Sequence, residues 1–391
     1  MNIINQNKIN RFILRKQHLA DDSKIDDIVQ VIKDIGGLHA QVPATPYLSL
    51  FERINNFTKE QLDEELYVKK NLGRIKCIRR TLYIFPRDMI SAAFVSTKRM
   101  LEPLCIRYTK QVGLTKQEYE EISTRIVRII HGKGMTTKEI TNELGTTLNI
   151  SLIVNLMCDQ GLLIRGIPKA GWRSNVHTYY PFSEYFSDVD LNGVNEANAR
   201  KLMVEQYLAS FGPVTENDIV WWTGFPKREI RLILESLQDK IIQLELPNID
   251  GNNIILCSDE KLLESVGTSK KQTVNLLPVL DPYIMGYKER KRYLDHKYYD
   301  SVFDFNGNAT STILLNGRVV GVWDLGKEAK PFFKIFLFEK IERNALREIH
   351  LKAEKIGKFI ADKEVQIKEC EAMVPLTHRT AGGFMSPLKE C

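Results

Sequence analysis

An imidazole and a carboxamide stand two residues apart at His39 and Gln41, between a pair of glycines and a pair of prolines. Residues two apart in an extended segment point to the same side, so both side chains could face one water molecule. An imidazole accepts a proton near neutral pH, and a carboxamide can orient a water molecule. The pair therefore predicts hydrolytic chemistry. The structural alternative is a helix cap or an ordinary polar contact.

The segment that carries this pair lies among predicted helices and a hairpin. The predicted elements are helices at 7–16, 24–35 and 45–54, a further helix capped by Thr58, and strands at 74–78 and 81–85. The helices follow from apolar residues at helical spacing, and the strands from runs of β-branched and aromatic residues. Helices followed by a hairpin are the outline of a winged helix, which we assign to residues 1–112.

The same order of elements recurs twice along the chain. Residues 113–192 contain predicted helices at 117–131, 137–144 and 151–160 and strands at 162–165 and 177–180. The tip of that hairpin carries Arg165, Lys169 and Arg173. Residues 193–268 contain predicted helices at 197–210, 216–223 and 227–239 and strands at 241–244 and 253–256. The spacing predicts three tandem winged helices rather than a short-period solenoid.

The remaining residues, 269–391, are richer in strands. Predicted strands cover 274–280, 312–315, 318–323 and 332–338, a helix covers 343–359, and the tail from residue 375 is an extended arm. Asn316-Gly317 is a strong signal for a two-residue hairpin turn. The predicted fold class is therefore α+β, mainly α, with three winged helices followed by a small C-terminal β-barrel or sheet.

Composition narrows the function classes. The net charge of +6 is mild, so a site for a polyanion must come from local clustering. The chain has no 18-residue apolar run and no signal-peptide core, so we expect a cytoplasmic, nucleoid-associated protein without a membrane partner. The six cysteines are scattered, which predicts reduced thiols. Neither zinc-ligand spacing nor a phosphate-binding loop occurs, so we expect no metal and no cofactor.

Three winged helices favour a double-stranded DNA partner. Such a unit usually places a helix in the major groove, and basic residues of its wing contact phosphates. Winged helices also mediate protein contacts, so a protein-interaction scaffold stays open. The leading alternative to an enzyme is a non-catalytic winged-helix transcription regulator, although such regulators normally carry one unit and a dimerisation surface.

Four stretches make the chain similar to the AlkZ/YcaQ-type family of winged-helix DNA glycosylases. They are residues 37–44 with Arg53, residues 80–83, residues 207–215 with 222–224, and residues 276–283. The resemblance implies a C-shaped monomer whose concave basic channel holds duplex DNA containing alkylated bases. It also implies hydrolysis of the N-glycosidic bond of N7-alkylated purines, and unhooking of interstrand crosslinks by some members.

The resemblance assigns the catalytic motif to His39 and Gln41, where histidine replaces the first glutamine of the family. Gln41 would hold the water, and His39 would act either as a general base or only as a hydrogen-bond partner. No lysine lies in the motif, which implies a monofunctional enzyme. The expected DNA-binding residues are Arg80, Arg165, Lys169, Arg173, Arg290, Lys291 and Arg292, and the expected channel residues are Tyr47, Arg53 and Asp281. For Tyr47 a core position is the alternative, and for Asp281 a turn.

Overall fold

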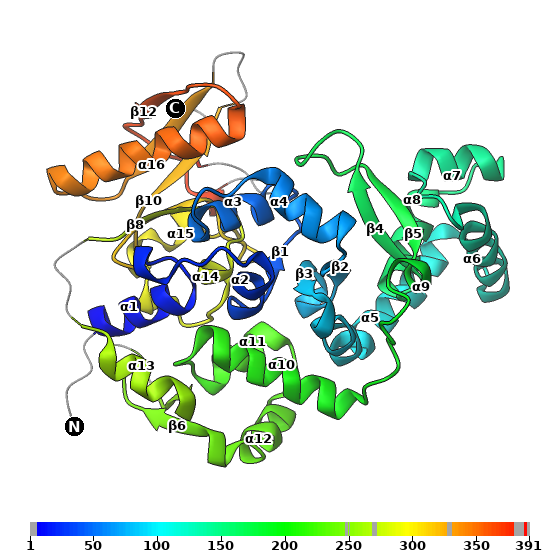
Figure 1. Cartoon of the computed structure of the whole chain (residues 1–391), viewed down its shortest axis with the longest axis horizontal. Coiled ribbons are helices and arrows are strands. Elements are labelled where there is room, and N and C mark those ends of the chain that lie inside the picture. Colours follow the sequence, from blue (N-terminus) through cyan, green and yellow to red (C-terminus); the bar gives the residue numbers. More distant parts are fainter. Residues whose placement is uncertain are drawn as a thin grey trace.

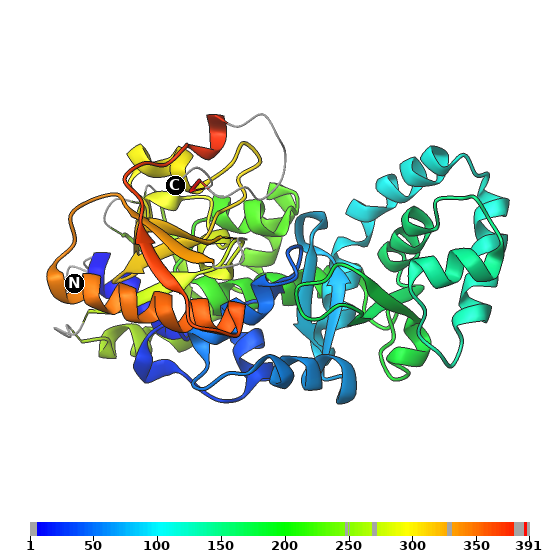
Figure 2. The same cartoon turned by 90° about the horizontal axis from the view of Figure 1, so that it is seen from above.

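The computed structural model describes residues 6–246, 249, 251–267, 272–326, 331–378 and 387–388, with side chains for all of these except 104–106, 108–110, 112 and 378. Part of the connection between the predicted strands at 241–244 and 253–256, and most of the predicted C-terminal arm, therefore lie outside the described residues. Figures 1 and 2 show a broad body and, at one end of the long axis, a lobe formed by α6–α8 and the β4–β5 hairpin.

The N-terminal unit contains the predicted helices and hairpin. Its elements are α1 (Gln6–Lys16), α2 (Ile28–Asp34), β1 (Leu38–His39), α3 (Thr45–Arg53), α4 (Lys59–Asp63), β2 (Leu72–Lys76), β3 (Leu82–Pro86) and α5 (Ile90–Val112). Helix α2 begins later than predicted because the Asp27 carboxylate caps it by accepting the backbone N–H of Gln30. The strands form an antiparallel sheet in the order β1-β3-β2, and β1 was not predicted.

The next two units each consist of three helices followed by an antiparallel hairpin, as predicted. The first has α6 (Lys116–Ile130), α7 (Thr137–Leu144), α8 (Ile150–Asp159), β4 (Leu163–Pro168), β5 (His177–Pro181) and the short α9 (Phe182–Tyr185). The second has α10 (Glu196–Phe211), α11 (Glu216–Thr223), α12 (Lys227–Glu235), β6 (Ile241–Leu244), β7 (Asn253–Leu256) and α13 (Glu260–Ser265). Thr136 and Thr215 cap α7 and α11, each within a capping box. The three-winged-helix interpretation and its domain boundaries stay predictions.

The C-terminal region is a sheet covered by a helix. Its elements are β8 (Val274–Leu277), α14 (Pro282–Met285), α15 (Tyr299–Val302), β9 (Thr312–Leu315), β10 (Arg318–Leu325), β11 (Phe332–Leu337), α16 (Arg343–Ala361) and β12 (Gln366–Glu369). The strand order is β12-β11-β10-β9-β8, and no pairing joins β12 to β8 in the described ranges, so closure into a barrel is not confirmed. Asn316 and Gly317 both have positive φ, which confirms the two-residue turn.

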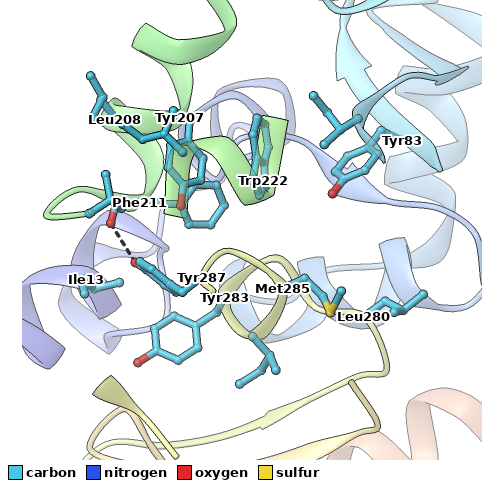
Figure 3. Close-up of a cluster of buried hydrophobic side chains, with 14 of the residues drawn as sticks. Ile13, Tyr83, Tyr207, Leu208, Phe211, Trp222, Leu280, Tyr283, Met285 and Tyr287 are labelled. Atoms are coloured by element: carbon cyan, nitrogen blue, oxygen red, sulfur yellow. Dashed lines mark hydrogen bonds between the residues drawn. The ribbon is translucent and has the colours of Figure 1, made fainter. Parts of the chain in front are cut away.

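An aromatic cluster joins α10 and α11 to the C-terminal region (Figure 3). The rings of Tyr207 and Trp222 lie 4.8 Å apart, and the ring of Phe211 lies 5.8 Å from that of Tyr287. The Tyr287 hydroxyl donates to the Phe211 carbonyl at 2.9 Å, so its one polar group is satisfied inside the core. The long sequence stretches at 207–215 and 276–283 are therefore packing surfaces.

Arg53 and Asp281 form a buried ion pair that makes a second contact between α3 and the C-terminal region. Both side chains are fully buried, and both guanidinium Nη atoms donate to the carboxylate at 2.8 Å. The same carboxylate accepts the Ser49 hydroxyl at 2.7 Å and caps α14 through the Tyr283 N–H. The prediction that Arg53 and Asp281 line a DNA channel is wrong, because the two charges satisfy each other in the core.

Two expectations drawn from composition have different outcomes. Cys77, Cys158 and Cys257 are free, whereas Cys370 is disulfide-bonded, so the expectation of reduced thiols throughout is wrong. Within the part of the chain that the structure describes, no helix combines the length and apolar character needed to cross a bilayer.

Candidate functional site

Strand pairing fixes the position of the His39–Gln41 segment. Gly36 and Gly37 have positive φ and turn the chain out of α2 into β1. His39 then pairs with Tyr83 on β3, and the Ala40 N–H donates to the Leu82 carbonyl at 2.7 Å. The segment is thus held at the edge of the β1-β3-β2 sheet, next to the β2–β3 hairpin.

The His39 imidazole is buried and neutral. Only 3% of the residue is exposed, and its ring packs 5.0 Å from that of Tyr83. Nδ1 accepts the backbone N–H of Gln41 at 3.4 Å. Burial, assisted by the nearby Arg79 guanidinium, lowers the pKa of His39 to about 3. A group with this pKa is a weak base at neutral pH, which favours hydrogen bonding over general-base catalysis.

Gln41, by contrast, is exposed and faces a cavity of about 620 Å³. Its Oε1 accepts the Leu82 N–H at 3.4 Å, which leaves the amide nitrogen available to a ligand. His39 is not among the residues that line this cavity. The two side chains of the motif therefore have different environments: Gln41 points into the cavity and His39 supports it from the core.

The cavity lies between the N-terminal unit and the lobe that contains α6–α8 and the β4–β5 hairpin, and cations from both parts line it. Arg74 and Lys76 come from β2, and Arg165 comes from β4. Lys76 pairs with Asp159 at 2.6 Å, and Arg165 donates to the Asn155 side chain at 2.6 Å. Of the three cations, only Arg165 was predicted from the sequence to bind DNA. The signal for Arg74 and Lys76 was their alternation on one face of a predicted strand.

His177 orients the most deeply buried of these cations, Arg74. The imidazole Nδ1 lies 3.1 Å from the Gly166 carbonyl, and the Arg74 Nη1 lies 3.3 Å from Nε2. A neutral ring that donates from Nδ1 and accepts at Nε2 satisfies both contacts. Burial, followed by the charge of Arg74, lowers the pKa of His177 to about 4, in agreement with this neutral form.

These two histidines predict that acid destabilises the fold. Both pKa values are lowered from the ordinary histidine value of about 6.5, to about 3 and about 4, so the unfolded chain binds more protons than the folded one below pH 6.5. Stability is therefore lost as the pH falls through this window, by about 2–3 kcal/mol for each histidine between pH 6.5 and 4.5. Urea unfolding at pH 7.5 and 4.5 measures this loss of stability. In His39→Gln the loss should be smaller by the contribution of one histidine, about 2–3 kcal/mol. An unchanged pH dependence in that variant would contradict the prediction.

The β4–β5 hairpin extends toward α3 and α4, and an aromatic contact docks it there (Figure 1). The Trp172 ring lies 5.2 Å from that of Tyr47 and 5.9 Å from that of Phe359 on α16. Tyr47 is fully buried and donates to Asp63, so its predicted channel position is wrong and the core alternative holds. Lys169 and Arg173 remain exposed on the hairpin.

The basic cluster at 290–292 divides into three environments. Lys291 is exposed, and Arg290 is half-buried with its guanidinium 3.5 Å from the centre of the Phe303 ring. Arg292 is 1% exposed and donates to Pro213 and Asp218. The prediction that Arg292 binds DNA is therefore wrong, because it joins α11 to the C-terminal region.

The β2–β3 turn contributes two arginines with opposite surroundings. Arg80 is exposed, as a phosphate-contacting residue should be, whereas the guanidinium of Arg79 stacks on Trp221 at 3.9 Å. Both have positive φ. Arg79 also acts on the His39 pKa, so it belongs to the surroundings of the motif. Arg80 rather than Arg79 was predicted from the sequence, since spacing alone does not show which of two neighbouring arginines faces the sheet.

Comparison with family models identifies the family. A family model described as DNA glycosylase AlkZ-like matches residues 32–359. Among solved structures, the chain is similar to the Streptomyces sahachiroi DNA glycosylase AlkZ, with a TM-score of 0.74, 16% identity, and coverage of 94% of this chain and 100% of that chain. At this identity the likeness shows the fold. No curated protein sequence matches the chain.

Proposed function

Since the chain belongs to the AlkZ-like DNA glycosylase family, we propose that it hydrolyses the N-glycosidic bond of N7-alkylated purines in duplex DNA. Gln41 positions the attacking water, and the reaction needs neither a metal nor a lysine nucleophile. The observation that carries this proposal is the exposed Gln41 carboxamide, which faces a cavity lined by Arg74, Lys76 and Arg165.

The chemistry suits a positioned carboxamide. An N7-alkylated purine already carries a positive charge, so the base leaves without strong acid catalysis. The demanding step is to bring water to C1′ while the sugar develops oxocarbenium character, as in other glycosyl hydrolysis. Orientation can supply much of this rate, and the amide of Gln41 can both accept from and donate to a water molecule.

His39 serves this step as a positioning residue. Its neutral Nδ1 accepts the Gln41 backbone N–H, and its burial against Tyr83 keeps the strand in place. The lowered pKa, about 3, leaves little proton affinity for a general base at neutral pH. We therefore assign His39 the hydrogen-bonding role rather than the general-base role.

Exposed cations on three parts of the chain are suited to the backbone of the DNA. Lys169 and Arg173 lie on the docked β4–β5 hairpin, Arg80 on the β2–β3 turn, and Lys291 in the C-terminal region. Such side chains bind phosphates without reading sequence, which is appropriate for an enzyme that searches for damage. We propose that the protein acts on double-stranded DNA as a monomer, and that bulky adducts and interstrand crosslinks are candidate substrates.

The test is excision from a duplex oligonucleotide with one N7-methylguanine, followed by alkali to reveal abasic sites. We expect strand breaks at the lesion with the protein and none in the undamaged duplex. If no break arises, a bulkier N7 adduct and an interstrand crosslink are tried in turn. Salt-dependent DNA binding without excision of any of the three would instead support the non-catalytic regulator.

A further inference from the structure

Arg74 is a buried cation that forms no direct ion pair in the described ranges. The residue is 5% exposed, and the nearby Asp63 carboxylate, whose pKa burial raises and the Arg74 charge acts to lower, accepts the Tyr47 hydroxyl instead. The Arg74 Nη1 contacts the neutral His177 ring, while its Nε is buried and has no hydrogen-bond partner. Burying a charge in this way is costly unless an opposite charge compensates for it. The arrangement indicates that an anion completes the site.

The cavity around Arg74 has an excess of positive charge. Three cations line it, and Asp159 is the single carboxylate among the lining residues. That carboxylate is paired with Lys76 at 2.6 Å, so Arg74 and Arg165 supply the uncompensated charge. Arg165 donates to Asn155 and also interacts with the Tyr179 side chain, and a guanidinium with five N–H groups still has donors for a ligand.

The charge of the cavity selects which part of a nucleotide enters it. An N7-alkylated base is itself cationic, and two unpaired guanidinium groups would repel it. A backbone phosphate is attracted, and the planar fork of arginine matches its oxygens. The base of the damaged nucleotide must then lie outside the cavity while a phosphate enters.

We propose that this cavity is a phosphate pocket that holds one backbone phosphate beside the damaged nucleotide, so that C1′ is presented to Gln41. The inference rests on the proposed function, because Gln41 lines the same cavity. Arg74 contacts the phosphate from β2 and Arg165 contacts it from β4. His177 keeps the Arg74 guanidinium oriented in the absence of DNA.

The experiment replaces individual phosphates around the lesion with uncharged methylphosphonates. Duplexes that carry one substitution at each phosphate within two nucleotides of N7-methylguanine are compared for kcat/KM. With the wild-type enzyme, we expect one position to cost about 10-fold or more, the size of a lost charge-assisted hydrogen bond. With Arg74→Gln or Arg165→Gln, excision from native DNA falls similarly, but the methylphosphonate at that position adds no further loss.

The control is Arg128→Gln, because Arg128 is an exposed arginine on α6 that does not line the cavity. Its effect should simply add to that of the methylphosphonate. Arg165 is half-buried, so its variant tests the pocket even if Arg74→Gln does not fold. In either pocket variant, the slope of log K for DNA binding against log salt concentration should also become shallower by about one, as expected for the loss of one phosphate contact.

The outcomes separate this inference from the proposed function. If the wild-type enzyme excises the lesion but every methylphosphonate effect adds to those of both pocket variants, the phosphate pocket is overturned and the glycosylase stands. If the wild-type protein excises nothing, the same comparison is made with binding constants. Non-additivity at one position would then support the pocket, and additivity at all positions would overturn it.

Discussion

Asp281→Ala is expected to lower the free energy of unfolding by about 3–5 kcal/mol. The Asp281 carboxylate accepts from both Nη atoms of Arg53, from the Ser49 hydroxyl and from the Tyr283 N–H. Its removal would leave the fully buried Arg53 guanidinium with only the Ser49 carbonyl as a hydrogen-bond partner. The cost is therefore mainly that of an uncompensated buried charge.

Urea unfolding at pH 7.5 measures this effect against two controls. Asp22→Ala removes an exposed ion pair with Arg15, and we expect a change of less than about 1 kcal/mol. The double variant Arg53→Met/Asp281→Leu removes both charges at once, and it should recover much of the stability lost in Asp281→Ala. A single variant as stable as the wild-type protein would show that the buried pair contributes little.

The buried Arg53–Asp281 pair also shows how a structural role can be mistaken for a functional one when only the sequence is known. Arg53, Asp281 and the stretch 207–215 are distinctive in the sequence, but they join α3, α10 and the C-terminal region in the core. A charged residue in a recognisable motif can hold two parts of the chain together in the core just as well as it can contact a ligand. Only burial distinguishes the two, and burial depends on tertiary packing.

Local signals predicted most of the elements. The cap at Thr58 and the Asn316-Gly317 turn are determined by residues within a few positions of each other, and both occur as predicted. The 23-residue α5 was missed, because Pro103 within it resembles a helix end.

The two short strands β1 and β12 were also missed, because partners distant in the sequence define them. The two residues of β1 pair with β3, and the four residues of β12 pair in parallel with β11. Neither segment is long enough to show an alternating pattern of its own. Strand pairing of this kind is tertiary information.

The candidate site shows the same division. The spacing of His39 and Gln41 drew attention to the correct segment, but it could not show that one side chain is buried and the other lines a cavity. That difference comes from β1 pairing with β3 and from the α6–α8 lobe across the cavity. Within the 290–292 cluster, likewise, Lys291 is exposed and Arg292 is buried, although both have the same charge.

Gln41→Ala is expected to reduce excision of N7-methylguanine by about 100-fold to 1,000-fold, the range found when one positioned polar group is removed from an active site. The loss should appear in kcat, and DNA affinity should stay within about threefold, since an exposed carboxamide contributes little to phosphate binding. Single-turnover excision and fluorescence anisotropy measure the two quantities. Gln117→Ala is the matched control, because Gln117 is another exposed glutamine, on α6, that does not line the cavity.

His39 variants complete this test, because the two roles considered for the histidine predict different results. His39→Gln retains a side-chain acceptor for the Gln41 N–H, so excision should stay within about 10-fold of wild type if hydrogen bonding is the role. His39→Ala removes the acceptor and should be more damaging. Equal losses of 100-fold or more in both variants would instead favour a general base. Neither the amide of the introduced glutamine nor the methyl group of the introduced alanine can take a proton from the attacking water. The buried, neutral imidazole therefore makes His39→Gln the more informative variant.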